Sequence, residues 1–268
     1  MIAKTVMVEG KKAQVYFLGD VHTGAANHQK DAFARAVKMI AESGGYWIGM
    51  GDYLDCINHK DQKRFNPKEV SPELSISDLD NLPIIQAESF VKSVMPIAKQ
   101  CLGLVAGNHE TAFRKHHTLD IMGYLCEKLG VDNLSGKAFV NIIVNEIPIS
   151  LHVCHGVGGG GMREGYPINK VHDIARWDIA NVHVIGHVHQ LACDRAVFNR
   201  YHHNKIQYIK TWYGVSGGFL SKSELNTESY FEQSPGKCSG IGMLELTIDS
   251  KHNSLSQTIT ELRKVYLD

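Results

Sequence analysis

The sequence carries VYFLGDVHTG at residues 15–24 and YWIGMGDYLD at residues 46–55. In each stretch a compact apolar run, typical of a buried strand, ends at a Gly-Asp pair. Between them, apolar residues recur at helical spacing from residue 33 to 40, and Gly44 marks the end of that helix. This order predicts an α/β fold, in which functional groups gather where the strands end.

The alternation of strands and helices continues along the chain. Further strands are predicted in CLGLVAG (residues 101–107), on both sides of Asn145-Glu146 and in VHVIG (residues 182–186), with helices at about 82–99, at about 118–129 and before residue 179. Residues 56–82 are polar and predict a long loop, and β-like segments dominate from Leu191 onward. We therefore expect one domain over residues 1–268, with a motif core at 14–190 and a β-rich part at 191–268.

Composition excludes several classes of protein. The 28 basic and 28 acidic residues cancel, so no global field recruits nucleic acid or an anionic membrane. Six widely spaced cysteines form no CxxC pair, which favours reduced thiols in a cytoplasmic protein. The N-terminus lacks the apolar core of a signal peptide, and no apolar run predicts a membrane span. The fifteen histidines stand out, because neutral imidazole is the commonest transition-metal ligand.

Five short motifs follow apolar runs: GDVHTG, GDYLD, GNHE, a His-Gly pair and GHVH. They supply Asp20, His22, Asp52, Asp55, Asn108, His109, Glu110, His155, His187 and His189. In the Asp-x-His and His-x-His pairs, an extended backbone would point both side chains to the same side. Carboxylate, amide and imidazole donors together suit Mn, Fe, Zn or Ni. The sequence thus predicts a metal centre at the strand ends.

In these motifs and their order, the chain resembles the calcineurin-like metallophosphoesterases, and the resemblance extends from Asp20 to His189. It implies a four-layer α/β/β/α sandwich that holds two divalent metal ions, with Mn favoured and Fe, Zn or Ni as alternatives. By motif position, one ion would be bound by Asp20, His22, Asp52 and His189, and the other by Asp52, Asn108, His155 and His187. Asp52 would bridge the two ions.

The resemblance also implies a mechanism for phosphoester hydrolysis. A hydroxide that bridges the two metals would attack phosphorus, since paired cations lower the pKa of a shared water. His109 would act as the general acid, and Asp55 would orient it by accepting a hydrogen bond from its other ring nitrogen. Glu110 is expected either to support the site or to cap a helix. Candidates for substrate binding are Arg114, His116 and Arg163.

Two positions distinguish this chain from the Ser/Thr protein phosphatases of the same superfamily. Cys56 and Ala106 stand where those enzymes place arginines, and the chain keeps a full GHVH pair. The pattern is more similar to the phosphodiesterase and DNA-repair exonuclease branches. We therefore expect a phosphodiesterase, of which a nuclease is one form, acting on a nucleotide or nucleic acid. A phosphomonoesterase acting on proteins or small molecules is the alternative, and a non-catalytic binding scaffold is a third hypothesis.

Two further features bear on ligand binding. The glycines at 156, 158 and 161 match a dinucleotide fingerprint, but the following strand ends in His187 and not in an acidic residue, so no nucleotide cofactor is expected. The β-rich part carries Arg195, Arg200, Lys205, Lys210, Trp212 and Tyr213, a mixture suited to phosphate contact and base stacking. The alternative for this segment is an ordinary solvated strand face.

Overall fold

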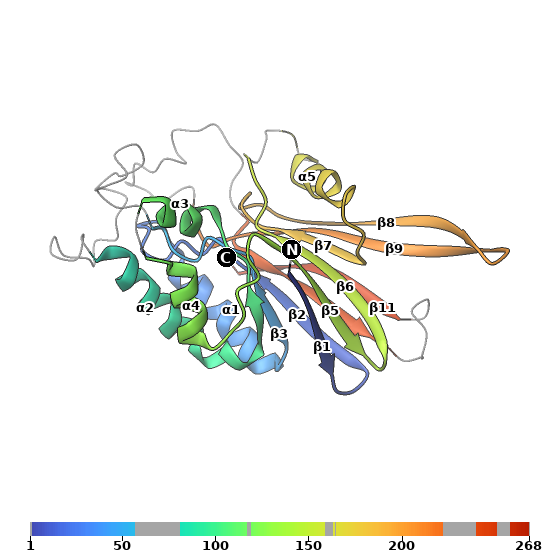
Figure 1. Ribbon diagram of the computed structural model, residues 1–268, viewed down its shortest axis with the longest axis horizontal. Coiled ribbons are helices and arrows are strands. Elements are labelled where there is room, and N and C mark those ends of the chain that lie inside the picture. Colours follow the sequence, from blue (N-terminus) through green and yellow to red (C-terminus); the bar gives the residue numbers. More distant parts are fainter. Residues whose placement is uncertain are drawn as a thin grey trace.

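The computed structural model describes residues 2–56, 81–116, 119–158, 163, 165–221, 240–250 and 258–267. Two β-sheets lie face to face, with helices on the outer face of each (Figure 1). The four layers confirm the α/β/β/α sandwich expected from the motifs. In the described part of the chain, no helix is long and apolar enough to cross a membrane.

The first sheet has the strand order β11-β10-β2-β3-β4. Its strands are β2 (Lys12–Leu18), β3 (Tyr46–Gly49), β4 (Cys101–Leu104), β10 (Gly242–Asp249) and β11 (Ile259–Tyr266). Strands β2, β3 and β4 run parallel, so their carboxyl ends lie at one edge of the sheet. Strands β10 and β11 add antiparallel neighbours on the far side of β2.

The second sheet has the strand order β1-β5-β6-β7-β9-β8. Its strands are β1 (Ile2–Val8), β5 (Lys137–Val144), β6 (Ile147–Cys154), β7 (Val182–Ile185), β8 (Leu191–His202) and β9 (Lys205–Ser216). Strands β6, β7 and β9 are parallel, and their carboxyl ends again share one edge. The β-rich C-terminal part therefore contributes strands to both sheets.

Between the sheets lies an aliphatic core. Val15 and Phe17 from the first sheet pack in one cluster with Val140, Ile142 and Leu151 from the second. All five side chains are fully buried. Along β5 buried and partly exposed residues alternate, as expected of a strand with one face against another sheet. This packing fixes the two sheets against each other and aligns their carboxyl edges.

Helices cover the two outer faces. The helical elements are α1 (Lys30–Ser43), α2 (Leu82–Val94), the 3-10 helix η3 (Met95–Gln100), α3 (Asn108–His116), α4 (Ile121–Leu129) and α5 (Tyr166–Ala175). Helices α1, α2 and α4 share an apolar cluster with residues of the first sheet, whereas α5 packs on the second. Helix α1 ends at Gly44, whose φ of 67° is the left-handed conformation that glycine adopts readily.

Most predicted elements are present, with instructive differences. Strand β1 and helix α3 were not predicted, because β1 has only one partly buried face and α3 begins inside the GNHE motif. The predicted helix at 82–99 changes to a 3-10 helix at Met95, next to Pro96. Most of the predicted loop at 56–82 lies outside the described residues. The described cysteines are free thiols, and Cys238 lies outside that part of the chain.

Candidate metal centre

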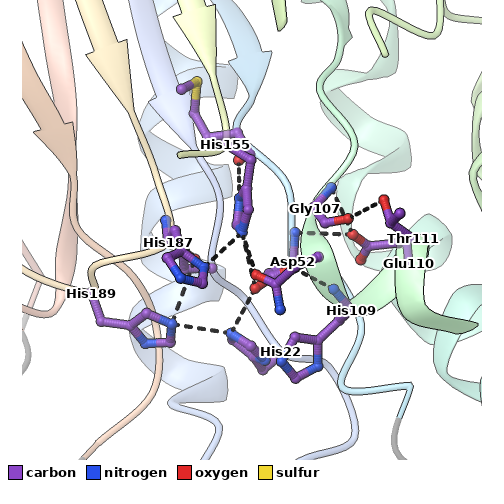
Figure 2. Close-up of polar contacts among 12 residues, drawn as sticks. His22, Asp52, Gly107, His109, Glu110, Thr111, His155, His187 and His189 are labelled. Atoms are coloured by element: carbon purple, nitrogen blue, oxygen red, sulfur yellow. Dashed lines mark hydrogen bonds and ion pairs between the residues drawn. The ribbon is translucent and has the colours of Figure 1, made fainter. Parts of the chain in front are cut away.

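The carboxyl edges of the two sheets bring the motif residues together. Asp20, Asp52 and Asn108 follow the parallel strands β2, β3 and β4 of the first sheet. His155 and His187 follow the parallel strands β6 and β7 of the second. Because the sheets pack face to face, side chains from both edges point into one space (Figure 2).

The backbone at this edge is strained. Positive φ angles occur at Asp20 (50°), His22 (50°), Asp52 (51°), His187 (70°) and His189 (55°). A residue with a side chain is held in this region at a cost of about 1–3 kcal/mol, and such strain clusters at functional sites. The expectation that the Asp-x-His and His-x-His pairs are extended was therefore wrong. Left-handed turns, and not a flat strand, direct these side chains into the site.

One group of donors consists of Asp20, His22 and His189, all buried. The Nε2 atoms of His22 and His189 are 3.2 Å apart, and His189 Nε2 is 3.5 Å from Asp20 Oδ1. Two nitrogens bound at about 2.1 Å to one cation, at tetrahedral or octahedral angles, lie roughly 3.0–3.4 Å apart. The three donors thus have the spacing of ligands to a single ion.

A second group consists of Asp52, His155 and His187. His155 Nε2 lies 3.1 Å from Asp52 Oδ2, 3.2 Å from His187 Nδ1 and 2.9 Å from Asn108 Oδ1. On the other side of the ring, His155 Nδ1 is 2.8 Å from the carbonyl oxygen of Met50. A proton on Nδ1 would donate to that carbonyl and leave the Nε2 lone pair directed at the other donors.

Asp52 lies between the two groups. Its Oδ2 atom is 3.1 Å from His155 of the second group and 3.8 Å from His22 of the first. Its other oxygen, Oδ1, accepts a hydrogen bond of 2.9 Å from the backbone N–H of His109. One carboxylate therefore reaches both sets of imidazoles, as a bridging ligand must.

The protonation of the site follows from burial and from the charge of Asp52. Burial alone would raise the pKa of Asp52, but His155 and its other histidine neighbours hold that pKa well below its usual range. Burial would lower the pKa of His155, yet the Asp52 carboxylate raises it to about 10, so a bound cation would have to displace the proton from its Nε2. Burial lowers the pKa of His189 to about 3 and, with His155 as a second cause, that of His187 to about 4. The last two rings are therefore neutral, as metal ligands need to be.

The residues predicted as the acid and its partner also meet, though differently from the expectation. His109 Nδ1 is 2.5 Å from the backbone carbonyl oxygen of Asp55, whereas the Asp55 carboxylate is 4.0 Å away. Burial lowers the pKa of His109, but the charges of Asp52 and Asp55 outweigh it, and the net pKa is raised. The carbonyl is thus the nearer group that orients the ring, and the carboxylate acts on its charge.

Of the two roles expected for Glu110, its contacts fit support of the site. Its buried carboxylate accepts hydrogen bonds from the backbone N–H groups of Asp52 (3.1 Å), Tyr53 (2.8 Å), Leu54 (3.2 Å) and Gly107 (3.0 Å). It thereby joins the turn after β3 to the turn after β4. Gly107 is required here, because a Cβ atom on it would lie 2.2 Å from Asp52 Oδ1. The sequence signal for this role was the GNHE glutamate itself.

Comparison with known proteins finds similar structures but no matching protein family and no matching curated protein. One solved structure is vacuolar protein sorting 29 from Cryptosporidium parvum, with a TM-score of 0.43, 14% identity, and coverage of 95% of this chain and 98% of that chain. Another is a predicted phosphoesterase from Streptococcus pneumoniae TIGR4, with a TM-score of 0.34, 8% identity, and coverage of 95% and 98%. A third is a metallophosphoesterase from Sphaerobacter thermophilus, with a TM-score of 0.38, 10% identity, and coverage of 95% and 89%.

Two of these structures carry phosphoesterase names. At these TM-scores and identities, the likeness concerns the fold alone. The chemistry depends on the side chains of the site, where His and Asp donors form groups able to bind metal.

The three predicted substrate-binding residues are less well defined by the structure. Arg114 is exposed on α3, one turn after Glu110, and Arg163 is exposed beside the glycine-rich loop. The side chain of His116 lies outside the described part. Lys170, on α5, donates hydrogen bonds to the carbonyl oxygens of Val157 and Gly158 at the start of the glycine-rich loop. The Lys170 side chain thus binds the backbone at the start of the loop.

Proposed function

We propose that this chain is a two-metal phosphoesterase that hydrolyses phosphodiesters. The observation that carries the proposal is the pair of donor groups that share Asp52 between them. In each group, ring nitrogens approach one another at 3.2 Å, a spacing that a common cation explains well. Neutral His187 and His189, together with a carboxylate whose pKa is low, make the donor set fit divalent ions.

This geometry supports a proposed set of ligands for two ions. Asp20, His22 and His189 would hold one ion, Asn108, His155 and His187 the other, and Asp52 would bind both. The mixed nitrogen and oxygen donors favour Mn, with Fe, Zn or Ni as alternatives. Bound ions at these positions would supply Lewis acidity at the phosphoryl oxygens and lower the pKa of water toward neutrality.

His109 is proposed as the general acid. The Asp55 carbonyl accepts from its Nδ1–H, so its other ring nitrogen, Nε2, remains to serve the leaving oxygen. The raised pKa of His109 keeps the ring protonated closer to neutral pH, as an acid requires. The backbone N–H of the same residue is bonded to Asp52, so the acid is positioned directly from the shared ligand.

Diesters are favoured over monoesters by the charge around the site. Cys56 is buried and uncharged, and its backbone N–H donates to Gln86. Ala106 is equally uncharged. Where protein phosphatases place arginines to neutralise a monoester dianion, this chain therefore adds no positive charge. A singly charged diester needs less neutralisation.

Hydrolysis of bis(4-nitrophenyl) phosphate by Mn-loaded protein tests the proposal. Turnover should be abolished by EDTA and restored by Mn, and His109→Ala should slow it by about 10²- to 10⁴-fold, the usual contribution of a general acid. Metal content, measured by mass spectrometry, should stay unchanged in that variant. His172→Ala, which removes a half-exposed imidazole from α5, is the control and should retain full turnover. Preference for 4-nitrophenyl phosphate would favour the monoesterase alternative, and no turnover with Mn, Fe, Zn or Ni would contradict both.

A further inference from the structure

Strands β8 and β9 form an arm that projects beyond the two sheets (Figure 1). The strands pair with each other along their whole length, from Leu191↔Ser216 to His202↔Lys205. In the described part of the chain, β9 pairs with β7 only from Trp212 to Val215. The outer part of the arm is therefore a two-stranded ribbon. Positive φ angles at His203 and Asn204 close it in a tight turn that matches the strand twist.

The outer ribbon exposes large side chains. Exposed fractions are 73% for Tyr201, 61% for Ile206, 70% for Tyr208 and 50% for Phe198. Such side chains contribute little to the stability of an isolated ribbon while they remain in water. Contiguous exposed apolar groups mark interaction surfaces.

Beyond Asp194, which lies near the base of β8, charge on the arm is of one sign. From Arg195 to Trp212 the sequence contains Arg195, Arg200, Lys205 and Lys210 and no acidic residue, although the whole chain is neutral. The excess charge is therefore concentrated on this element, and it complements a polyanion. A second copy of this chain would bring the same uncompensated charge to the interface, which disfavours self-association through the arm.

One face of the arm combines cations with aromatic rings. Cross-strand register places Tyr201 opposite Ile206, and Lys210 opposite Val197, on the same face as Tyr208. At the base of this face, the Arg195 guanidinium lies 5.5 Å from the centre of the Trp212 ring. Tyrosines near the tip and cations toward the base form a stripe, here called the arm stripe (Arg195, Tyr201, Tyr208 and Lys210).

The arm begins at the candidate metal centre. Strand β8 starts two residues after His189, and β9 leads to Phe219, whose backbone N–H donates to the carbonyl oxygen of Asp20. Strands of 12 residues, rising about 3.3 Å per residue, carry the tip roughly 35–40 Å from that point. A stacked strand of nucleic acid advances about 3.4 Å per nucleotide, so roughly ten nucleotides would be needed to contact both the tip of the arm and the metal centre.

We infer that the arm stripe binds single-stranded nucleic acid. Exposed tyrosines offer stacking faces that only unpaired bases can use, and the cations contact phosphates. The inference rests on the proposed function for the chemistry at the strand ends, since each link of such a strand is a phosphodiester. It names the substrate class for that chemistry.

Binding of a fluorescent 20-nucleotide oligothymidylate, followed by anisotropy in EDTA, tests the inference without turnover. The variant Tyr201→Ala/Tyr208→Ala/Lys210→Ala changes exposed side chains, so its fold should be retained, as circular dichroism would verify. Its affinity should fall by at least about tenfold, because each stacked base contributes substantially to such complexes. The slope of log affinity against log salt should shrink by about 0.7 for the lost phosphate contact. A five-nucleotide probe should bind the unaltered protein weakly.

The matched control is Tyr124→Ala/Tyr266→Ala/Lys92→Ala, which removes the same side-chain types outside the arm and should bind like the unaltered protein. Equal affinity of the arm variant and this control would overturn the inference. Preference for a 20-base-pair duplex would also overturn it. So would an arm variant that loses dimers in light scattering but still binds oligothymidylate. Turnover of bis(4-nitrophenyl) phosphate should be unchanged in the arm variant. If neither the unaltered protein nor the variants hydrolyse that diester while oligothymidylate binding still depends on the arm, the proposed function fails and the binding role stands.

Discussion

The described part of the chain contains two histidine clusters, one at the strand ends and one on the outer face of the second sheet. The sheet-face cluster contains His152 on β6, His183 on β7 and His172 on α5, together with Asp178 and Tyr213. Like the metal centre, it combines buried imidazoles with a carboxylate, and His152 Nε2 lies 3.4 Å from Asp178 Oδ2. By composition alone the two clusters are hard to tell apart.

Their geometry differs. In the sheet-face cluster His172 stacks on Tyr213 with centroids 4.0 Å apart, and His183 is nearly parallel to the same ring. His183 meets His152 edge to face, and this one pair of ring nitrogens lies 3.4 Å apart. The cluster's two strand histidines occupy regular strand positions. At the strand ends, ring nitrogens converge and left-handed turns hold them there. Clustered histidines thus indicate a metal site when three or more ring nitrogens and carboxylate oxygens converge, which among the described residues happens only at the strand ends. Strained backbone is an independent sign of such a site.

The sharpest test of this comparison, and the largest expected effect, removes one imidazole from each cluster. His187→Gly should reduce diester turnover by more than about 100-fold, since even groups that merely support a metal ligand contribute 10- to 100-fold. Urea unfolding of the EDTA-treated variant should show stability within about 1 kcal/mol of the unaltered protein, because glycine relieves the strain at φ 70°.

His183→Gly is the counterpart and should behave in the opposite way. Turnover should stay within about twofold, while the unfolding free energy should fall by about 2–5 kcal/mol as a buried side chain is lost from a strand. Similar losses of stability in both variants would remove the proposed distinction between strained and regular positions.

A smaller effect on turnover is expected from Glu110→Gln. The amide nitrogen would replace an acceptor oxygen and leave two backbone N–H groups unpaired, at about 1–3 kcal/mol each. Displacement of Asp52 should reduce turnover by about 10- to 100-fold. The control is Glu245→Gln, an equally buried glutamate that pairs with Arg263 on β11. It should lose stability in urea and retain turnover; equal turnover in both variants would show that Glu110 does not position the site.

The smallest effect concerns pH and the sheet-face cluster. Burial, with His152 as a second cause, lowers the pKa of His183 from 6.5 to about 4. The unfolded chain therefore takes up a proton below pH 6.5 that the folded chain does not, so this residue's contribution to stability is lost as pH falls. His183→Leu should reduce the loss of unfolding free energy between pH 7 and pH 5 by about 1–2 kcal/mol. Urea titrations at both pH values measure it, and an unchanged difference would refute the prediction.

The sequence predicted much of the fold because its signals are local. Compact apolar runs marked most strands of the two sheets, helical spacing marked most of the helices, and the glycine at 44 marked a helix end. Strand β1 was not predicted because only one of its faces is partly buried and because it is held in the sheet by pairing with β5, far along the chain. The long β8–β9 segment was recognised as strands, but its projection beyond the sheets depends on where β7 stops pairing.

By itself, the sequence determined which chemical groups follow which strands, because a residue's type and its distance from an apolar run are properties of the chain. Tertiary structure alone decided which groups meet. The positions of Asp52 between two imidazole sets, of the Asp55 carbonyl against His109 and of Glu110 beneath two turns all depend on how the sheets pack. Distances between residues far apart in sequence are set by the shared core, and no short motif encodes them.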